Sequence, residues 1–260
     1  MKLHKTALIT GATGGIGEEL CREFARNGYD LVITARGKEA LERQALRLRR
    51  TYGVAVVIFA GDLADKDTPL RLFGQLGEVG VVVDVLVNNA GYGVGGYFAG
   101  SSLRSLEDML QVNVLAATRF CRLFLPEMLR RRDGHILNIA SVGAYVPGPM
   151  NAVYCAGKAY LLHLSEALAQ ECRGKGVKVS AVCPWAVGTG FADRADMEST
   201  LLFNLGVLQA KEVARAAYCA MERGQTVCTV GPAAKLTAAA VRLAPRGLSA
   251  RVSGILQKPR

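Results

Sequence analysis

Short apolar runs alternate with longer amphipathic stretches along this chain of 260 residues. Brief runs rich in Val, Ile and Leu are typical of buried strands, whereas apolar residues that recur every three or four positions indicate helices. The expected strands lie at residues 6–10, 31–35, 54–60, 85–88, 135–140, 177–183 and 226–230. The expected helices lie between them, at residues 15–27, 38–51, 66–77, 102–131, 152–173 and 210–223. Because strand and helix alternate, the sequence predicts an α/β fold, a doubly wound parallel sheet of about seven strands with helices on both faces.

We expect one domain covering residues 1–260, because no linker, repeat or low-complexity segment divides the chain. A composition of 50% hydrophobic and 21% charged residues suits one large core. Several expected helices end near a glycine, which readily takes the left-handed conformation found after helix ends. These glycines are Gly28, Gly53, Gly134, Gly176 and Gly224.

The seven cysteines are scattered, odd in number and without a CxxC pair, which indicates neither a disulfide framework nor a zinc site. The histidines His4, His135 and His163 show no ligand spacing, so we expect no metal. Residues 1–5 lead directly into an apolar strand and not into a signal peptide, and no apolar run approaches the roughly 18 residues of a membrane span. We therefore expect a soluble, cytoplasmic protein.

A glycine-rich turn follows the first expected strand, with the sequence Thr10-Gly11-Ala12-Thr13-Gly14-Gly15-Ile16-Gly17. Glycines permit a tight turn and allow backbone N–H groups to approach a pyrophosphate at the positive end of a helix. A plain turn is the alternative, but a strand before it and a helix after it favour dinucleotide binding. The expected cofactor contacts in this turn are Gly11, Thr13, Gly14, Gly15, Ile16 and Gly17.

A tyrosine and a lysine four residues apart, Tyr154 and Lys158, lie in the expected helix at 152–173. Positions four apart share one helix face, so the phenol and the ammonium can enter the same pocket. A cation there favours the phenolate and lowers the pKa of Tyr154 toward working pH, which suits a proton donor and acceptor. Ser141 ends an apolar run thirteen residues before Tyr154. The stretch from Ser141 to Lys158 therefore indicates acid–base chemistry.

The choice of cofactor depends on the charge at the end of the second expected strand. Ala35 stands where a carboxylate for the ribose hydroxyls would be, and Arg36 follows it. A guanidinium offers charge-assisted hydrogen bonds to a 2′-phosphate, and Lys38 is a candidate second contact. The alternative is a surface arginine that only begins the next helix. We expect NADP(H).

With these motifs the chain resembles the short-chain dehydrogenase/reductase family over roughly residues 5 to 190. The glycine turn satisfies the TGxxxGxG spacing of the short members through Gly15 and the TGxxGxxG spacing of the extended members through Gly14. Asn88-Asn89-Ala90-Gly91 matches the NNAG motif, and Asn113, Ser141 and the YxxxK pair match the four catalytic positions. These matches and the length of 260 residues favour the short, single-domain type with its Rossmann-like fold.

The resemblance implies a role for each catalytic residue. Tyr154 would exchange a proton with the substrate oxygen as hydride passes to or from the nicotinamide, and Ser141 would orient that oxygen. Lys158 would lower the pKa of Tyr154 and hold the nicotinamide ribose, and Asn113 would bend its helix around a water that links Lys158 to solvent. Tyr145 has no lysine four residues on and is expected to form a pocket wall.

Further cofactor contacts follow from the resemblance. They are Asp62 and Leu63 near the adenine, Asn89, Ala90 and Gly91, the catalytic Tyr154 and Lys158, and Pro184, Val187 and Thr189 near the nicotinamide. A helix N-cap is the alternative role for Asp62. The chain departs from the family at Pro184-Trp185, where the family has Pro-Gly, so Trp185 is a candidate wall of the site.

These residues together predict an NADP(H)-dependent oxidoreductase that interconverts a carbonyl and an alcohol on a small-molecule substrate. The substrate lid is expected at residues 188–209, and the apolar candidates for the pocket are Val146, Met150, Trp185, Phe191 and Leu201-Leu202-Phe203. They favour a reductase of an apolar or acyl-type carbonyl, although packing of the lid against the domain explains them equally well. Two alternatives stay open: a non-redox isomerase or dehydratase of the same family, and a catalytically silent NADP-sensing binding protein.

Much of the net charge of +10 lies in a basic tail at residues 232–260, because no Asp or Glu follows Glu222. The apolar residues of this tail recur at near-helical spacing: Leu236, Ala239, Ala240, Leu243, Leu248, Val252 and Ile255. For the charge, a solvated helix face is the favoured explanation, and nucleic acid, an anionic membrane surface or an acidic partner are the alternatives. For the apolar spacing, docking against the core or a second subunit is the simpler explanation, and contact with an anionic membrane is the alternative. We expect a homodimer or homotetramer and no nucleic-acid partner.

Overall fold

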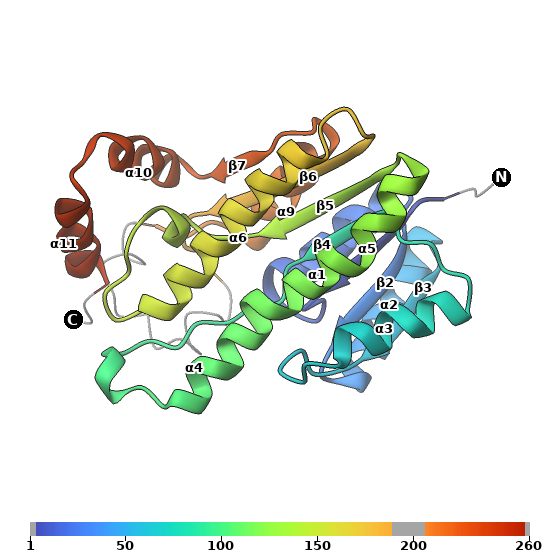
Figure 1. The fold of residues 1–260 in the computed structure, drawn as a ribbon. Helices are drawn as coiled ribbons and strands as arrows, with labels where there is room; N and C mark the ends of the chain where they lie inside the picture. The colour runs from blue at the N-terminus through green and yellow to red at the C-terminus, as the bar shows by residue number, and fades with distance from the viewer. Residues whose placement is uncertain (1–3, 189–205, 258–260) are drawn as a thin grey trace.

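A sheet of parallel strands lies at the centre of the computed structural model, which describes residues 4–188 and 206–257. The strands of this described part are β1 (Thr6–Thr10), β2 (Asp30–Ala35), β3 (Val56–Ala60), β4 (Val85–Asn88), β5 (Gly134–Ile139), β6 (Val177–Pro184) and β7 (Val227–Val230). Their order across the sheet is β3-β2-β1-β4-β5-β6-β7 (Figure 1). The predicted doubly wound, Rossmann-like sheet is confirmed, and each strand begins and ends within two residues of its predicted position.

Helices cover both faces of the sheet (Figure 1). The α-helices of the described residues are α1 (Gly15–Arg26), α2 (Lys38–Tyr52), α3 (Thr68–Glu78), α4 (Leu103–Leu110), α5 (Ala117–Arg131), α6 (Ala152–Glu171), α9 (Ala210–Glu222), α10 (Pro232–Leu243) and α11 (Arg246–Leu256). One apolar cluster joins α1, α2 and α9 to one face through Phe24, Leu41 and Val213. A second cluster joins α3 and α5 to the other face through Leu72 and Phe120. Burial on both faces explains why the strands read as continuous apolar runs in the sequence.

The predicted helix at 102–131 is interrupted in the structure. A π-helical segment, Gln111–Ala116, separates α4 from α5. The prediction that Gly134 takes a left-handed conformation after this helix is wrong, because Arg132 takes that conformation with φ of 55° and Gly134 begins β5. A side chain at Gly134 would place its Cβ 2.5 Å from Cγ of Met128, so close packing explains this glycine. The other four predicted glycines do have left-handed backbones.

The strand order reverses between β1 and β4. β1 pairs with β2 on one side and with β4 on the other, and the chain continues outward to β3 and to β7. The connections that leave the carboxyl ends of β1 and β4 therefore diverge over opposite halves of the sheet. In open parallel sheets such a reversal opens a crevice in which ligands bind.

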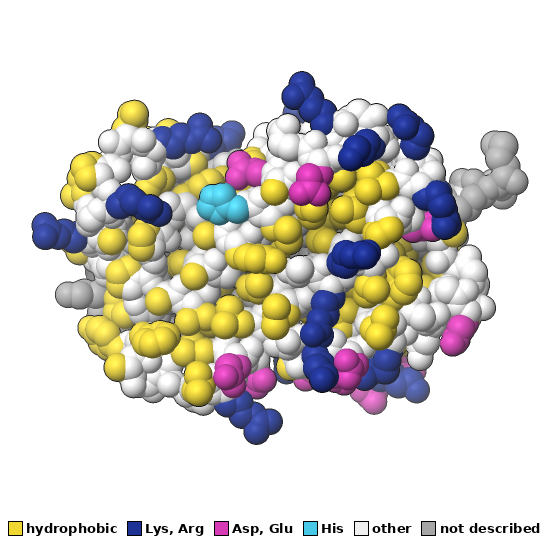
Figure 2. Space-filling model, in the orientation of Figure 1, with side chains coloured by type: hydrophobic (Ala, Val, Ile, Leu, Met, Phe, Trp, Pro, Cys, Tyr) yellow, Lys and Arg dark blue, Asp and Glu magenta, His cyan; other side chains and the backbone are white. Residues whose placement is uncertain are grey.

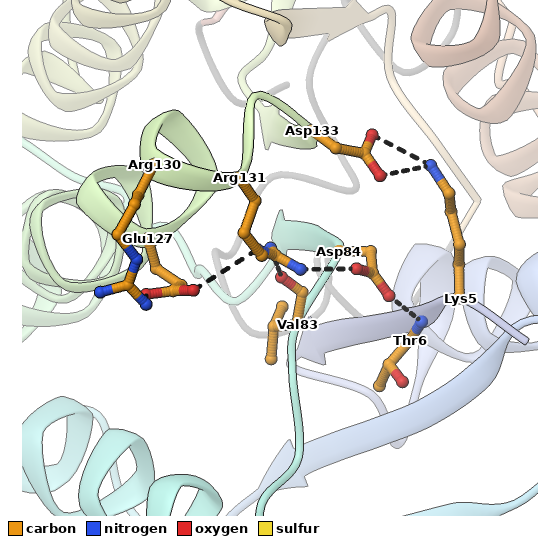
Figure 3. A network of polar contacts seen from close by, with 8 residues as sticks. All are labelled: Lys5, Thr6, Val83, Asp84, Glu127, Arg130, Arg131 and Asp133. Atoms are coloured by element: carbon orange, nitrogen blue, oxygen red, sulfur yellow. Dashed lines mark hydrogen bonds and ion pairs between the residues drawn. The ribbon is translucent and has the colours of Figure 1, made fainter. Parts of the chain in front are cut away.

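A buried carboxylate holds the opposite edge of the sheet together (Figure 3). Asp84 precedes β4 and accepts a hydrogen bond from the backbone N–H of Thr6 at 2.8 Å. Arg131, at the end of α5, donates to Asp84 at 2.9 Å and to the carbonyl of Val83 at 3.0 Å. The same figure contains a second ion pair, between Lys5 and Asp133 at 3.0 Å, whose side chains are about half exposed.

The tail helices dock against the rest of the chain. α10 buries Ala234 in a small cluster with Val142 and Trp185. After α11, the buried amide of Gln257 accepts a hydrogen bond from Nδ2 of Asn151 at 3.0 Å. The predicted docking of the tail against the core is therefore confirmed at these contacts.

Several other expectations concern membranes, thiols, metals and the lid. No helix within the described ranges is long and apolar enough to cross a membrane. All seven cysteines are free thiols, and residues 4–188 and 206–257 contain no group of three or more His, Cys, Asp or Glu placed to hold a metal ion. Thr189, Phe191 and the rest of residues 189–205, which make up most of the predicted lid, lie outside the described residues.

Replacing Arg131 by Met should lower the free energy of unfolding by about 3 kcal/mol, because a largely buried carboxylate loses its cationic partner. Lys5→Met removes a solvent-exposed pair of the same kind and should cost less than about 1 kcal/mol. Urea denaturation followed by circular dichroism measures both variants. Equal losses in the two variants would contradict the importance of the buried pair.

Candidate active site

The glycine turn after β1 wraps closely around its own backbone. Gly11 has a left-handed φ of 64°, and a Cβ on Gly17 would lie 2.0 Å from the carbonyl oxygen of Gly11. Gly14 caps α1 without a side chain, and a Cβ built on it would meet nothing within 4 Å. The first turn of α1 therefore faces open space with its N–H groups not capped by a side chain. This arrangement fits an anionic ligand at the positive end of the helix.

The NNAG segment is bonded to that turn. The hydroxyl of Thr10 accepts hydrogen bonds from the backbone N–H groups of Asn89 at 3.0 Å and Ala90 at 2.9 Å. The side-chain amide of Asn89 donates to the carbonyls of Thr10 at 2.9 Å and Gly11 at 3.3 Å. The ends of β1 and β4 are thereby joined, and the predicted cofactor contacts at Gly11, Asn89 and Ala90 lie together at the strand-order reversal.

The π-helical segment places Asn113 against the chain that follows β4. Its Nδ2 donates to the carbonyl of Tyr92 at 2.8 Å, and its Oδ1 accepts the N–H of Tyr92 at 3.1 Å. A Cβ built on Gly91 would lie 3.1 Å from Oδ1 of Asn113 and 3.5 Å from Nζ of Lys158. Asn113 and Lys158, which are 45 positions apart in the sequence, therefore both lie beside Gly91. Such π-helical insertions are frequent at functional sites.

A buried chain of amides and a hydroxyl supports the site from beneath. Nδ2 of Asn88 donates to Asn138 at 2.8 Å, and Nδ2 of Asn138 donates to the hydroxyl of Ser165 at 2.8 Å. Asn88 and Asn138 are register partners on β4 and β5, and Ser165 belongs to α6. Asn138 and Ser165 were missing from the sequence prediction. Two asparagines inside apolar strands were the available signal, because buried amides need partners.

Ser141 and Tyr154 come together where β5 leads into α6. Ser141 follows β5 and begins a short 3₁₀ turn, Val142–Tyr145, in which its hydroxyl accepts the N–H of Gly143 at 3.1 Å. A Cβ built on Gly143 would lie 3.5 Å from Oγ of Ser141 and 3.8 Å from Cε1 of Tyr154. Lys158, one turn further along α6, places its Nζ 5.8 Å from the centre of the Tyr154 ring. Three of the four predicted catalytic side chains, those of Ser141, Tyr154 and Lys158, therefore lie close together.

The electrostatics of this pair differ from the prediction. Burial among protein atoms raises the pKa of Tyr154 well above its ordinary value, and a hydrogen bond with Ser141 only partly opposes that rise. The ammonium of Lys158 donates instead to the carbonyl of Ile139 at 2.7 Å and lies over the Tyr154 ring. Burial also lowers the pKa of Lys158 to about 8. The predicted lowering of the Tyr154 pKa by Lys158 is absent from this structure, because desolvation dominates.

The predicted adenosine-side residues follow β2 and β3. Arg36 is exposed and makes no ion pair with the described part of the chain. The pKa of Tyr92 is raised, chiefly by burial, and the positive charge of Arg36 opposes part of that rise. Asp62 is exposed, and its carboxylate accepts the N–H of Ala64 at 2.9 Å, so it does not cap α3, which Asp67 precedes. Leu63 is buried.

The segment after β6 is buried in the protein, although Trp185 was expected to form a wall of the site. Trp185 is buried with Val142, and its indole N–H donates to the carbonyl of Gly206 at 3.1 Å. Val187 is buried and pairs with Leu208, while Pro184 ends β6. This packing accounts for the departure from Pro-Gly, because an indole fills the space that a glycine would leave.

Tyr145 also proves to be structural. Its hydroxyl makes a hydrogen bond with the hydroxyl of Thr229 on β7 at 2.8 Å. Burial raises its pKa. The ring packs against the apolar clusters that contain Ala144 and Trp185. Tyr145 is therefore a packing residue, and we assign no chemistry to it.

Comparison with protein families matches residues 5–199 to the short chain dehydrogenases. The chain belongs to the short-chain dehydrogenase family. Members are oxidoreductases that bind a nicotinamide dinucleotide, so the enzyme class expected from the sequence is confirmed. This short-chain dehydrogenase is 34% identical to the ketoacyl reductase HetN of Nostoc sp. over 85% of its own length and 77% of that protein.

Other relatives are longer proteins or solved structures. The very-long-chain 3-oxoacyl-CoA reductase of Anas platyrhynchos is 33% identical, and the match spans 70% of this short-chain dehydrogenase but 60% of that relative. A short-chain dehydrogenase from Sphingobium yanoikuyae, solved in complex with NADPH, superposes with a TM-score of 0.83 at 33% identity over 94% of each chain. One from Burkholderia phymatum, solved with NAD, reaches 0.82 at 28% identity over 99% and 98% of the two chains.

The burial of Lys158 predicts a stability cost in this short-chain dehydrogenase. A folded-state pKa of about 8 lies below the ordinary 10.5, so between these pH values the folded protein binds fewer protons than the unfolded chain. The destabilisation by Lys158 is therefore complete below pH 8 and is relieved as the pH rises toward 10.5. At pH 7, Lys158→Met should stabilise the protein by about 1–2 kcal/mol after the loss of the hydrogen bond to Ile139.

Urea denaturation at several pH values checks this expectation. The advantage of Lys158→Met should shrink between pH 8 and 10.5. The exposed Lys175→Met controls for the loss of one positive charge. A Lys158→Met variant that is less stable than the parent at pH 7 would contradict the cost of desolvation.

Proposed function

We propose that this protein is an NADPH-dependent reductase that converts an acyl-type or other apolar carbonyl into an alcohol. The observation that carries the proposal is the half-buried Tyr154, hydrogen-bonded with Ser141 and lying beneath the ammonium of Lys158. A phenol whose pKa is raised by burial holds its proton at neutral pH. A protonated phenol at this position can donate its proton to a carbonyl oxygen as the carbonyl is reduced.

Each side chain then has a distinct part. Ser141 would donate a hydrogen bond to the carbonyl oxygen and fix it near the Tyr154 hydroxyl. After Tyr154 gives up its proton, the charge on Lys158 would stabilise the phenolate across the ring. Asn113 positions the chain at Tyr92 and thereby the space beside Gly91 that Lys158 faces.

The dinucleotide would supply the hydride when bound. Its pyrophosphate suits the uncapped first turn of α1 at Gly14, where open space and N–H groups meet. Arg36, exposed after β2 and without an acidic partner in the described ranges, would hold the 2′-phosphate. Asp62, Leu63 and Gly91 follow the neighbouring strands and would line the rest of the site, together with Val187. The Sphingobium yanoikuyae relative was solved with NADPH, which supports a preference for NADPH over NADH. The Burkholderia phymatum relative was solved with NAD, so the proposed preference depends on Arg36.

The acyl character of the substrate rests on two lines of support. Relatives include a ketoacyl reductase and a very-long-chain 3-oxoacyl-CoA reductase. An open groove lined mainly by apolar side chains includes Met150, which lies four residues before Tyr154 in the sequence. An acyl chain is the ligand that such a lining suits.

We also propose that the protein is a cytoplasmic homo-oligomer. Leu103, Leu110, Leu115 and Tyr160 are exposed on the helical face formed by α4 to α6, and Figure 2 shows apolar side chains gathered over this face. Packing of the same face from a second copy would cover them in a homodimer or homotetramer. The free thiols suit the reducing cytoplasm.

NADPH oxidation across 3-oxoacyl thioesters of increasing chain length, simple ketones, aldehydes and sugars tests the proposed function. We expect the highest kcat/KM with the longer 3-oxoacyl thioesters. Tyr154→Phe should lower kcat about 10²- to 10⁴-fold, because the proton donor is lost, and should leave NADPH binding intact. Tyr160→Phe is the matched control, since Tyr160 lies on the same helix and its hydroxyl shares a hydrogen bond with that of Thr118 at 3.0 Å.

Unchanged NADPH oxidation by Tyr154→Phe would refute the role of the phenol. Substrate conversion without net NADPH consumption would identify an isomerase or dehydratase instead. Binding of NADPH with no turnover of any compound would favour a silent binding protein.

Arg36→Ala should raise the Kd for NADPH about 10- to 100-fold and change the Kd for NADH little, because only NADPH carries the 2′-phosphate. Arg43→Ala, an exposed arginine on α2, controls for the loss of a nearby positive charge. Titration of protein fluorescence with each dinucleotide measures the four constants. Equal weakening of NADPH and NADH would show that Arg36 does not select the phosphate.

A further inference from the structure

The last helix of the described chain, α11, buries polar side chains and exposes apolar ones, which is the opposite of an ordinary surface helix. α11 buries Ser253 on its inner side, and Gln257 just beyond its end is buried too. Leu256 is half-buried, but the large apolar side chains of Leu248, Val252 and Ile255 are instead exposed, with Ile255 at 58%. Their spacing of four and three residues places them on one outward face. A surface helix normally buries such a stripe, so this face lacks its partner in the described part of the molecule.

The preceding helix extends the same pattern. Leu236 and Leu243 of α10 are exposed, Leu243 at 90%, while Ala234 is fully buried. Tyr97, 74% exposed, and Phe98, 66% exposed, lie in a different part of the sequence. Tyr97 lines the same open groove as Ile255, so this aromatic pair adjoins α11.

Positive charge surrounds these apolar residues. Lys235, Arg242, Arg246 and Arg251 are exposed on α10 and α11, and no Asp or Glu follows Glu222 anywhere in the sequence. The ion pairs among the described residues are all made by other cations. In Figure 2, the end of the molecule where Figure 1 places α10 and α11 shows yellow and dark blue side chains and no magenta ones.

From this surface we infer that α10 and α11 dock the protein on an anionic lipid bilayer. Helices that combine exposed Leu, Val and Ile with Lys and Arg lie in the interface of such membranes, with apolar side chains among the acyl chains and cations at the phosphates. Aromatic side chains at the rim, here Tyr97 and Phe98, favour the same boundary.

A second copy of the chain fits this face less well. A two-fold dimer would place the face against itself and bring Arg242, Arg246 and Arg251 of one copy near those of the other. Like charges without carboxylates between them repel, whereas anionic headgroups neutralise them. Charge complementarity therefore selects the lipid surface as the occupant.

Sedimentation of the full-length protein with vesicles tests the inference. We expect binding to vesicles of equal parts phosphatidylglycerol and phosphatidylcholine, much weaker binding to pure phosphatidylcholine, and a decrease at high ionic strength. Leu243→Ser with Ile255→Ser should lower the partition coefficient about tenfold or more. Leu46→Ser with Leu70→Ser removes two exposed leucines from α2 and α3 and should leave binding unchanged.

The charged residues are tested in the same assay. Arg242→Gln with Arg246→Gln should weaken binding to the anionic vesicles, and Arg43→Gln with Arg50→Gln on α2 is the matched control. Thermal melts by circular dichroism confirm that every variant folds.

Three results would overturn the inference. The full-length protein could stay in the supernatant with both kinds of vesicle. The tail and control variants could bind equally. Finally, light scattering could show that Leu243→Ser with Ile255→Ser breaks a larger assembly in a protein that binds no vesicles, which would make the face a subunit interface.

Discussion

The hydrogen bonds between the ends of β1 and β4 are the contact on which the rest of the site depends. Thr10 accepts two backbone N–H groups from Asn89 and Ala90, and the Asn89 amide returns two bonds to the glycine turn. Both strands end at the reversal of strand order, so their loops would otherwise diverge. Joining them orients the first turn of α1 and holds Gly91 in place. Asn113 and Lys158 then approach Gly91 from two different helices.

Polar groups inside the sheet fix the relative positions of strands and helices that apolar packing alone leaves less specific. Asn88, Asn138 and Ser165 form one such chain across β4, β5 and α6, on the side of the active site. Asp84 and Arg131 form another at the opposite end of β4. A buried amide or carboxylate without its partners costs folding free energy, so few other arrangements of these strands and helices are stable. The position of α6, and with it Tyr154, follows from these bonds.

Desolvation then determines the chemistry available to the pocket. The same burial that raises the pKa of Tyr154 lowers the pKa of Lys158 to about 8, because both groups are driven toward their neutral forms. In the proposed mechanism this neutral phenol supplies the proton to the carbonyl. The burial of Lys158 lowers the folding stability.

The sequence alone determined the strand positions, the parallel sheet, the glycine turn and the residue types of the pocket, because periodicity and side-chain chemistry are local properties. It also indicated the helical tail at Leu236 to Ile255. Tertiary structure alone decided that Asn113 lies in a π-helical segment, that burial raises the pKa of Tyr154, and that α11 turns Ile255 outward and Ser253 inward. Backbone insertions, desolvation and exposure all depend on atoms that come together from distant parts of the chain. A local sequence pattern therefore cannot predict them.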